Sequence, residues 1–181
     1  CLYHALLDPR TSMDVDGRFK TAHGEIKKVD YTHRTMFSGW DVYRSEFPLL
    51  TITRPDVVND MINSLIEIAE HENVSFPRWE LLGHETGCMI GDPGIIVTVD
   101  AYTKGIRNFN VQKAYDICLK TVFDPDSKRI GRALFNQYGY VPDNISATLE
   151  NVFADHCISL FADALGDCER VAFFRARAQN Y

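Results

Sequence analysis

Apolar residues recur at the spacing of an α-helix in several long stretches of this chain. Pro55 suits a first helical position, and one apolar stripe follows it: Val58, Met61, Ile62, Leu65, Ile68 and Ala69. A second stripe begins behind the capping residue Asn110: Val111, Ala114, Tyr115, Cys118 and Val122. These patterns predict two amphipathic helices, each with one buried side.

The last third of the chain has the same helical pattern. One long stripe ends at Gly166: Ile145, Leu149, Val152, Phe153, His156, Leu160, Phe161 and Ala164. We expect this side of the helix to be buried, with His156 as a hydrogen-bonded core histidine. Asp167 then caps a further helix that runs through Val171 and Phe174 to the chain end.

Two segments are less regular. The run 95–99 has strand propensity, but Asp92 as cap, Pro93 at the first position and Gly105 at the end frame a helix. We therefore predict a buried helix there, and a short helix over 2–7. Residues 10–36 are polar and rich in turn formers, which favours a loop or a short hairpin.

Composition narrows the class of protein. The 181 residues are 45% hydrophobic and 24% charged, values typical of a globular domain. A net charge of −6 argues against a nucleic-acid partner, and no apolar run approaches the length of a membrane span. Five cysteines without a Cys-x-x-Cys pair predict neither a disulfide framework nor a zinc site.

Two tryptophans stand directly before a carboxylate, Trp40 before Asp41 and Trp79 before Glu80. An indole covers the apolar face of a sugar ring, and a carboxylate accepts hydrogen bonds from neighbouring hydroxyls. The residues alone favour half-buried packing tryptophans beside solvated acids, because tryptophan is usually highly buried. Arg44 follows Asp41 at the spacing of one helical turn, and we expect the two to pair.

The segments around these tryptophans resemble the family-ninety-two glycoside hydrolases, which are calcium-dependent exo-acting α-mannosidases. The matching residues are Phe37-Ser38-x-Trp40-Asp41-x-Tyr43-Arg44, then Trp79-Glu80-Leu81-x-Gly83-x-Glu85-Thr86-x-Cys88-Met89-Ile90-Gly91, and Asp100-Ala101-Tyr102-x-Lys104-Gly105. Weaker matches occur at both ends of the chain. Two positions depart from the family pattern: Gly39 replaces a bulkier apolar residue, and His156 follows Asp155 where an aspartate and a tryptophan are expected. The second departure puts any role of Asp155 in doubt.

The resemblance implies an all-α fold in which residues 1–181 form the central part of an (α/α)₆ barrel, six helical hairpins closed in a ring. It implies a parent enzyme that removes terminal α-linked mannose with inversion, assisted by calcium. The catalytic acid, the base and the calcium ligands are expected beyond Tyr181, so we assign none of them within this chain. The implied partner is a mannose-containing glycan, and the implied location is secreted, periplasmic or at the cell surface.

Sugar-binding residues are expected in the two matching segments. Asp41 with Trp40 is the first choice, Glu85 is the second, and Arg44, Trp79 and Glu80 complete the set. Glu80 is as readily an ordinary acid on the rim of the barrel.

Two other classes of protein remain open: a non-catalytic helical carbohydrate-binding or scaffold domain, and another six-hairpin glycosidase acting on glucose or uronic acids. We also expect the isolated chain to be inactive and to self-associate, because a partial barrel exposes apolar helix faces.

Overall fold

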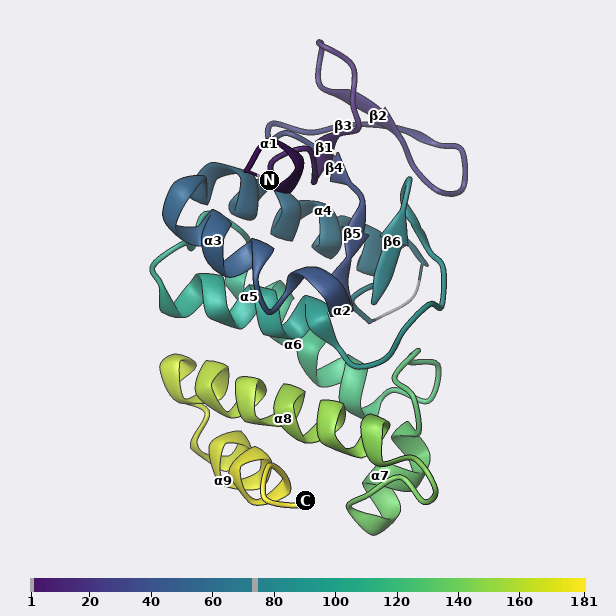
Figure 1. The fold of residues 1–181 in the computed structure, drawn as a ribbon, viewed down its shortest axis with the longest axis vertical. Helices are drawn as coiled ribbons and strands as arrows, with labels where there is room; N and C mark the ends of the chain where they lie inside the picture. The colour runs from purple at the N-terminus through teal and green to yellow at the C-terminus, as the bar shows by residue number, and fades with distance from the viewer. Residues whose placement is uncertain (1, 73–74) are drawn as a thin grey trace.

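The computed structural model describes residues 2–72 and 75–181 (Figure 1). Its helices are α1 (Leu2–Ala5), α2 (Gly39–Val42), α3 (Glu46–Thr53), α4 (Pro55–Glu72), α5 (Pro93–Thr103), α6 (Val111–Phe123), α7 (Arg132–Tyr138), α8 (Ile145–Leu165) and α9 (Cys168–Arg177). Its strands are β1 (Arg10–Thr11), β2 (Arg18–Lys20), β3 (Ile26–Lys28), β4 (Arg34–Thr35), β5 (Phe37–Ser38), β6 (Trp79–Leu81) and β7 (His84–Glu85).

The long helices pack on one another along the length of the molecule. α4 contacts α3, α5 and α6, whereas α8 contacts α5, α6 and α9. Figure 1 shows the chain descending from the strands near the N-terminus, through α5 and α6, to the α8–α9 pair at the C-terminus. Within the described residues, no helix is both long enough and apolar enough to cross a membrane.

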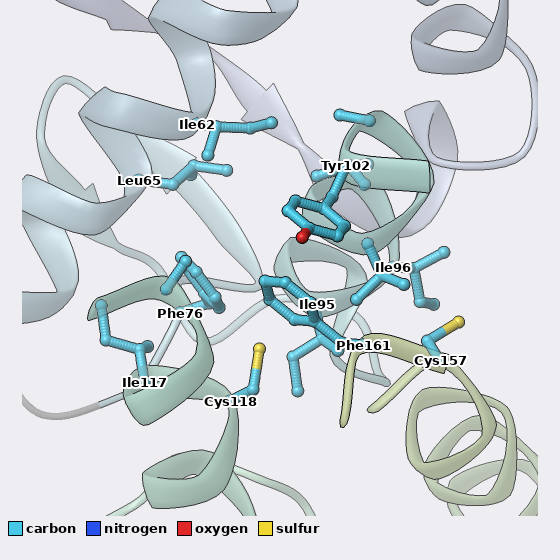
Figure 2. Close-up of a cluster of buried hydrophobic side chains, with 14 of the residues drawn as sticks. Ile62, Leu65, Phe76, Ile95, Ile96, Tyr102, Ile117, Cys118, Cys157 and Phe161 are labelled. Carbon is cyan, nitrogen blue, oxygen red and sulfur yellow. The ribbon is translucent and has the colours of Figure 1, made fainter. Parts of the chain in front are cut away.

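The hydrophobic core lies where α4, α5, α6 and α8 meet (Figure 2). Ile62 and Leu65 of α4 face this core, as do Cys118 of α6 and Phe161 of α8, all of them fully buried. The predicted helix at 93–104 is confirmed by α5. Its apolar run resembles a strand because the helix is buried on nearly every side, and a fully buried helix needs no polar face.

Two of the predicted helix caps are confirmed, whereas Asp92 stands before α5 without a side-chain capping bond and pairs with Arg129 instead. The Asn110 side chain accepts a hydrogen bond from the backbone N–H of Lys113, and Asp167 accepts one from Arg170. Gly166 ends α8 in the left-handed conformation that glycine adopts without strain. The apolar sides of α4 and α6 are buried as predicted.

The prediction for the buried side of α8 is wrong in part. Val152 and Phe161 are buried, but His156 is exposed, so it is not a core histidine. Large apolar residues on its stripe are also exposed: Ile145, Leu149, Phe153 and Leu160. The spacing of apolar residues alone could not show which side of α8 is buried. The helix is apolar on more than one side, and only one side packs against α5 and α6.

The strict all-α expectation is also wrong. The segment 10–36 forms the expected short hairpin, with β2 antiparallel to β3, and β1 pairs with β4. A third sheet, in the order β5-β6-β7, lies outside this segment and joins residues more than forty positions apart. Each of these strands has only two or three residues, too few to produce a clear alternating pattern.

Asp155, whose role the sequence left in doubt, belongs to a buried network of ion pairs. Its fully buried carboxylate lies 2.8 Å from a guanidinium nitrogen of Arg129 and 2.7 Å from Nε of Arg177. Arg129 also lies 3.0 Å from Asp92, the residue before α5. This network joins α8, α9, the start of α5 and the loop before α7, so Asp155 holds helices together.

The described cysteines 88, 118, 157 and 168 are free, and Cys1 lies outside the described residues.

Candidate functional site

The two tryptophan motifs lie side by side, although about forty residues separate them. Antiparallel pairing of β5 with β6 places Ser38 opposite Trp79 and Phe37 opposite Glu80. Gly39 follows β5 and starts α2. A Cβ atom at Gly39 would lie 2.4 Å from the backbone oxygen of Arg78 and 2.4 Å from Cγ of Pro93. Glycine is therefore required at this departure from the family pattern, because it lets α2 approach the second motif closely.

Asp41 is exposed on α2, one turn after the strand ends. The hydroxyl of Ser38 donates a hydrogen bond to Oδ2 of Asp41 over 2.5 Å. This bond stays within the first motif and holds the carboxylate against the start of the helix. A carboxylate oriented in this way can accept hydrogen bonds from the hydroxyls of a ligand at the surface.

The predicted pairing of Arg44 with Asp41 is wrong for the described residues. The guanidinium of Arg44 instead lies over the Trp40 ring, 3.9 Å from its centroid, and donates to the backbone oxygen of Trp40 over 3.1 Å. This stacking is a cation–π contact that covers one face of the indole. Arg44 therefore orients the tryptophan rather than the aspartate.

Glu150 of α8 completes this arrangement, and sequence reasoning missed it. The indole Nε1–H of Trp40 donates to Oε1 of Glu150 over 3.0 Å. Burial raises the pKa of the Glu150 carboxyl, while the Trp40 bond and the charge of Arg44 counteract that effect. In the sequence, Glu150 is one of the polar residues between the apolar positions of the predicted helix, and 110 positions separate it from Trp40. No local signal could have linked the two.

Glu80 is fully buried, so the expectation of a rim acid is wrong. Its Oε1 accepts a hydrogen bond from the Thr35 hydroxyl over 2.5 Å and one from the Gly83 backbone over 2.6 Å. Burial raises the pKa of Glu80, and these hydrogen bonds counteract the rise. The carboxylate ties the turn after β6 to β4. It has no surface open to a ligand.

Glu85 organises its own loop. One carboxylate oxygen accepts hydrogen bonds from the backbone N–H groups of Arg78 and Trp79, and the other accepts one from Gly87 over 2.6 Å. Glu85 also lines a cavity of about 270 Å³ with His23 and Lys128, and Trp40 is not part of that lining. The bonds that the structure shows for the Glu85 carboxylate go to the backbone of the second motif, so Glu85 holds this loop in place.

Arg78 is a second residue that sequence reasoning missed. Its buried guanidinium donates to the backbone oxygens of Gly87, Met89 and Lys128, at 3.2, 2.9 and 2.7 Å. Trp79, beside it, is half-buried on β6. Arg78 and Glu85 together fix the loop 86–91 that continues the second motif.

The described residues contain no cluster of carboxylates that would fit a calcium site. In residues 2–72 and 75–181, no three His, Cys, Asp or Glu side chains gather where they could hold one metal ion. Calcium prefers six to eight oxygen ligands, several of them carboxylates. We therefore derive no step through a metal ion in this part of the chain.

Taken together, the geometry defines a helical domain that presents a fixed indole beside an exposed carboxylate. The whole chain, residues 1–181, matches the glycosyl hydrolase family 92 catalytic domain. The chain therefore belongs to this glycosyl hydrolase family. No curated protein matches it.

Solved structures with the same fold agree with this assignment. The family 92 α-mannosidase BT3965 from Bacteroides thetaiotaomicron, in complex with mannoimidazole, is 31% identical with a TM-score of 0.92; the match covers 99% of this chain and 24% of that one. The inverting mannosidase BT2199 from the same organism is 31% identical with a TM-score of 0.88, covering 100% of this chain and 26% of that one. This chain thus spans about a quarter of the proteins it resembles.

Proposed function

We propose that this chain is part of the catalytic domain of an exo-acting α-mannosidase that hydrolyses terminal α-linked mannose with inversion. The family assignment over the whole chain supports the glycosidase class. The similar enzymes are an α-mannosidase with bound mannoimidazole and an inverting mannosidase, which supports the substrate and the stereochemistry. We propose further that the parent protein closes its helical pairs into the six-hairpin barrel.

The observation that carries the proposal is the corner formed by Trp40 and Asp41. The carboxylate is exposed and oriented by Ser38, and the neighbouring indole is fixed by Glu150 and Arg44. A terminal mannose presents a C–H face for the indole and hydroxyls for the carboxylate. We therefore assign Asp41 and Trp40 to binding the terminal mannose, and Arg78, Glu80 and Glu85 to holding the scaffold beneath them.

The chemistry of inversion requires groups that this chain does not supply in our proposal. One carboxylic acid protonates the leaving oxygen, and a carboxylate roughly 6.5–9.5 Å away activates a water on the opposite face of the sugar. We place that pair, and the oxygen ligands of a calcium ion, in parts of the parent outside residues 1–181. The task of this chain is to bind and orient the sugar.

The test uses the full-length parent with an aryl α-mannoside and an α-linked mannobiose. We expect release of mannose, and proton NMR should detect β-mannose as the first product, because inversion converts the α-linkage to the β-anomer. A chelator should abolish the activity and added calcium should restore it. An α-anomeric first product would contradict inversion. Mannose binding without hydrolysis would favour the non-catalytic binding domain instead.

The isolated 181-residue chain should be inactive and should self-associate. Apolar side chains on α8 are open to solvent, with Ile145 78% and Leu149 50% exposed, and surfaces of this kind favour association. Light scattering on the purified chain should show oligomers, and an activity assay should show no mannose release. Calcium-dependent hydrolysis by this chain alone would refute the expectation.

A further inference from the structure

Glu150 is a half-buried acid whose position the fold alone does not explain. One carboxylate oxygen, Oε1, accepts the indole N–H of Trp40 over 3.0 Å. The other, Oε2, is buried, and no hydrogen-bond donor in the described part of the chain reaches it. The indole N–H needs one acceptor, which a neutral oxygen would also supply, whereas burying a second carboxylate oxygen without a donor costs free energy.

The surroundings of Glu150 connect it to both tryptophan motifs. It lies on α8, its bond reaches α2 of the first motif, and the loop of the second motif packs against its carboxyl group. That last contact is made at Gly91, where a Cβ atom would lie 2.6 Å from Oε2. The φ of 78° at Gly91 is in the left-handed region, so glycine permits both the turn and the close approach.

The bond from Glu150 also determines how the indole can rotate. Arg44 lies over one face of the ring at 3.9 Å and leaves rotation within the ring plane free. The hydrogen bond at Nε1 fixes that remaining freedom, because it holds one edge of the ring toward α8. The indole beside Asp41 is therefore fixed by a face contact and by an edge contact.

We propose that Glu150 is a positioning residue that holds the Trp40 indole in the orientation needed to bind a terminal mannose. The proposal rests on the proposed function and deepens it. Glu150 acts through Trp40, and its carboxylate does not touch the sugar. Its value to the enzyme is geometric, since a small misplacement of a substrate-positioning group reduces turnover strongly.

The expected effect distinguishes loss of the acceptor from loss of charge. In the full-length parent, Glu150→Ala removes the acceptor, and we expect kcat/KM on an aryl α-mannoside to fall about tenfold. Glu150→Gln keeps an oxygen that can accept the indole N–H, so its kcat/KM should stay within about threefold of the wild-type value. The matched control is Asp163→Ala, which removes an exposed carboxylate from the same helix, where it pairs with Arg175 at 3.0 Å.

A double-mutant cycle provides the decisive measurement. Trp40→Phe keeps an aromatic ring but removes the N–H group, so Glu150 has nothing to position in that background. We expect Glu150→Ala to change kcat/KM by less than about twofold when Trp40 is already phenylalanine. We expect Glu150→Ala to change the melting temperature little in either background, whereas a purely structural role would lower it in both.

The outcomes separate this proposal from the proposed function. An active parent in which Glu150→Ala causes the same loss in both backgrounds overturns the positioning role and leaves the mannosidase assignment intact. An active parent in which Glu150→Ala leaves kcat/KM unchanged overturns the role as well. A full-length parent that hydrolyses no α-mannoside overturns the proposed function first, and the positioning role with it. Loss in the wild-type background alone, with activity retained in Glu150→Gln, supports the proposal.

Discussion

The two tryptophan–carboxylate pairs of this chain have the same chemistry but opposite environments. Asp41, after Trp40, is exposed on a helical turn, whereas Glu80, after Trp79, is fully buried in a strand. Asp41 accepts a bond from a serine in its own motif, and Glu80 accepts bonds from a threonine on another strand and from the turn that follows it. A dipeptide therefore does not determine where its carboxylate points.

The backbone explains the difference. Successive side chains of a strand point to opposite sides of the sheet, so a half-buried Trp79 directs Glu80 into the interior. In the α2 turn, neighbouring side chains are about 100° apart, so Trp40 and Asp41 can both reach the surface region. The first motif therefore exposes the carboxylate that we propose as a binding group, whereas the carboxylate of the second motif is buried and stabilises the strands.

Removing the buried acid should have the largest effect. Glu80→Ala leaves the Thr35 hydroxyl and the Gly83 N–H without their acceptor in the interior. Leaving buried donors unpaired costs ~1–3 kcal/mol each, so we expect a loss of about 3 kcal/mol or more in unfolding free energy. A thermal melt of the full-length parent measures this. A normal melting temperature with at least tenfold lower kcat/KM would place Glu80 in the binding site instead.

Removing the exposed acid should affect activity and not stability. Charge-assisted hydrogen bonds contribute ~1.5–3 kcal/mol each, so Asp41→Ala should lower kcat/KM at least about tenfold. The melting temperature should change little, because a surface carboxylate contributes little to the core. We would assay an aryl α-mannoside and melt the same preparation. Unchanged kinetics would remove Asp41 from the site, and a collapsed melting temperature would make it a structural residue.

The helices could be predicted from sequence because their signals are local. The stripe after Pro55, the cap at Asn110 and the stop at Gly166 each act within a few residues, and the structure confirms all three. Local framing also identified the helix at 93–104 against its strand propensity. The helical spacing of apolar residues did not reveal which side of α8 packs against the rest of the molecule.

The proposed site could be predicted only where its contacts are local. Asp41 and Trp40 were found because they stand together, and the turn that carries them follows directly from β5. The bonds of Glu80 to Thr35 and of Trp40 to Glu150 span 45 and 110 positions, so they depend on tertiary structure that a single sequence does not reveal. The partner of Arg44 is local but could not be chosen from spacing, because Asp41 and Trp40 lie three and four positions before it and both are within reach on a helix.

A smaller effect should follow from removing the hydroxyl that holds Asp41. Ser38→Ala keeps the carboxylate but deletes the donor at 2.5 Å, so Asp41 can turn away from its binding orientation. A hydrogen bond of this kind contributes ~0.5–1.5 kcal/mol, and we expect kcat/KM to fall about threefold. The control is Ser45→Ala, whose hydroxyl makes no capping bond to α3. Equal losses in both variants would show that the bond to Asp41 has no specific role.

The smallest effect should be a pH dependence of stability that comes from the buried Glu80. Burial raises the pKa of Glu80 in the folded chain above its ordinary value, although hydrogen bonds from Thr35 and Gly83 oppose the rise. Between the two values the folded state holds a proton that the unfolded state has lost, so stability falls as pH increases through that window. Below the ordinary value of about 4.3 both states are protonated, and Glu80 does not make stability depend on pH.

Glu80→Gln does not titrate, so its melting temperature should rise relative to that of the wild type as pH increases from about 4 to about 8. The measurement is the difference between the two melting temperatures across that range. A difference that moves the opposite way would mean that the hydrogen bonds outweigh burial and hold the pKa of Glu80 below its ordinary value.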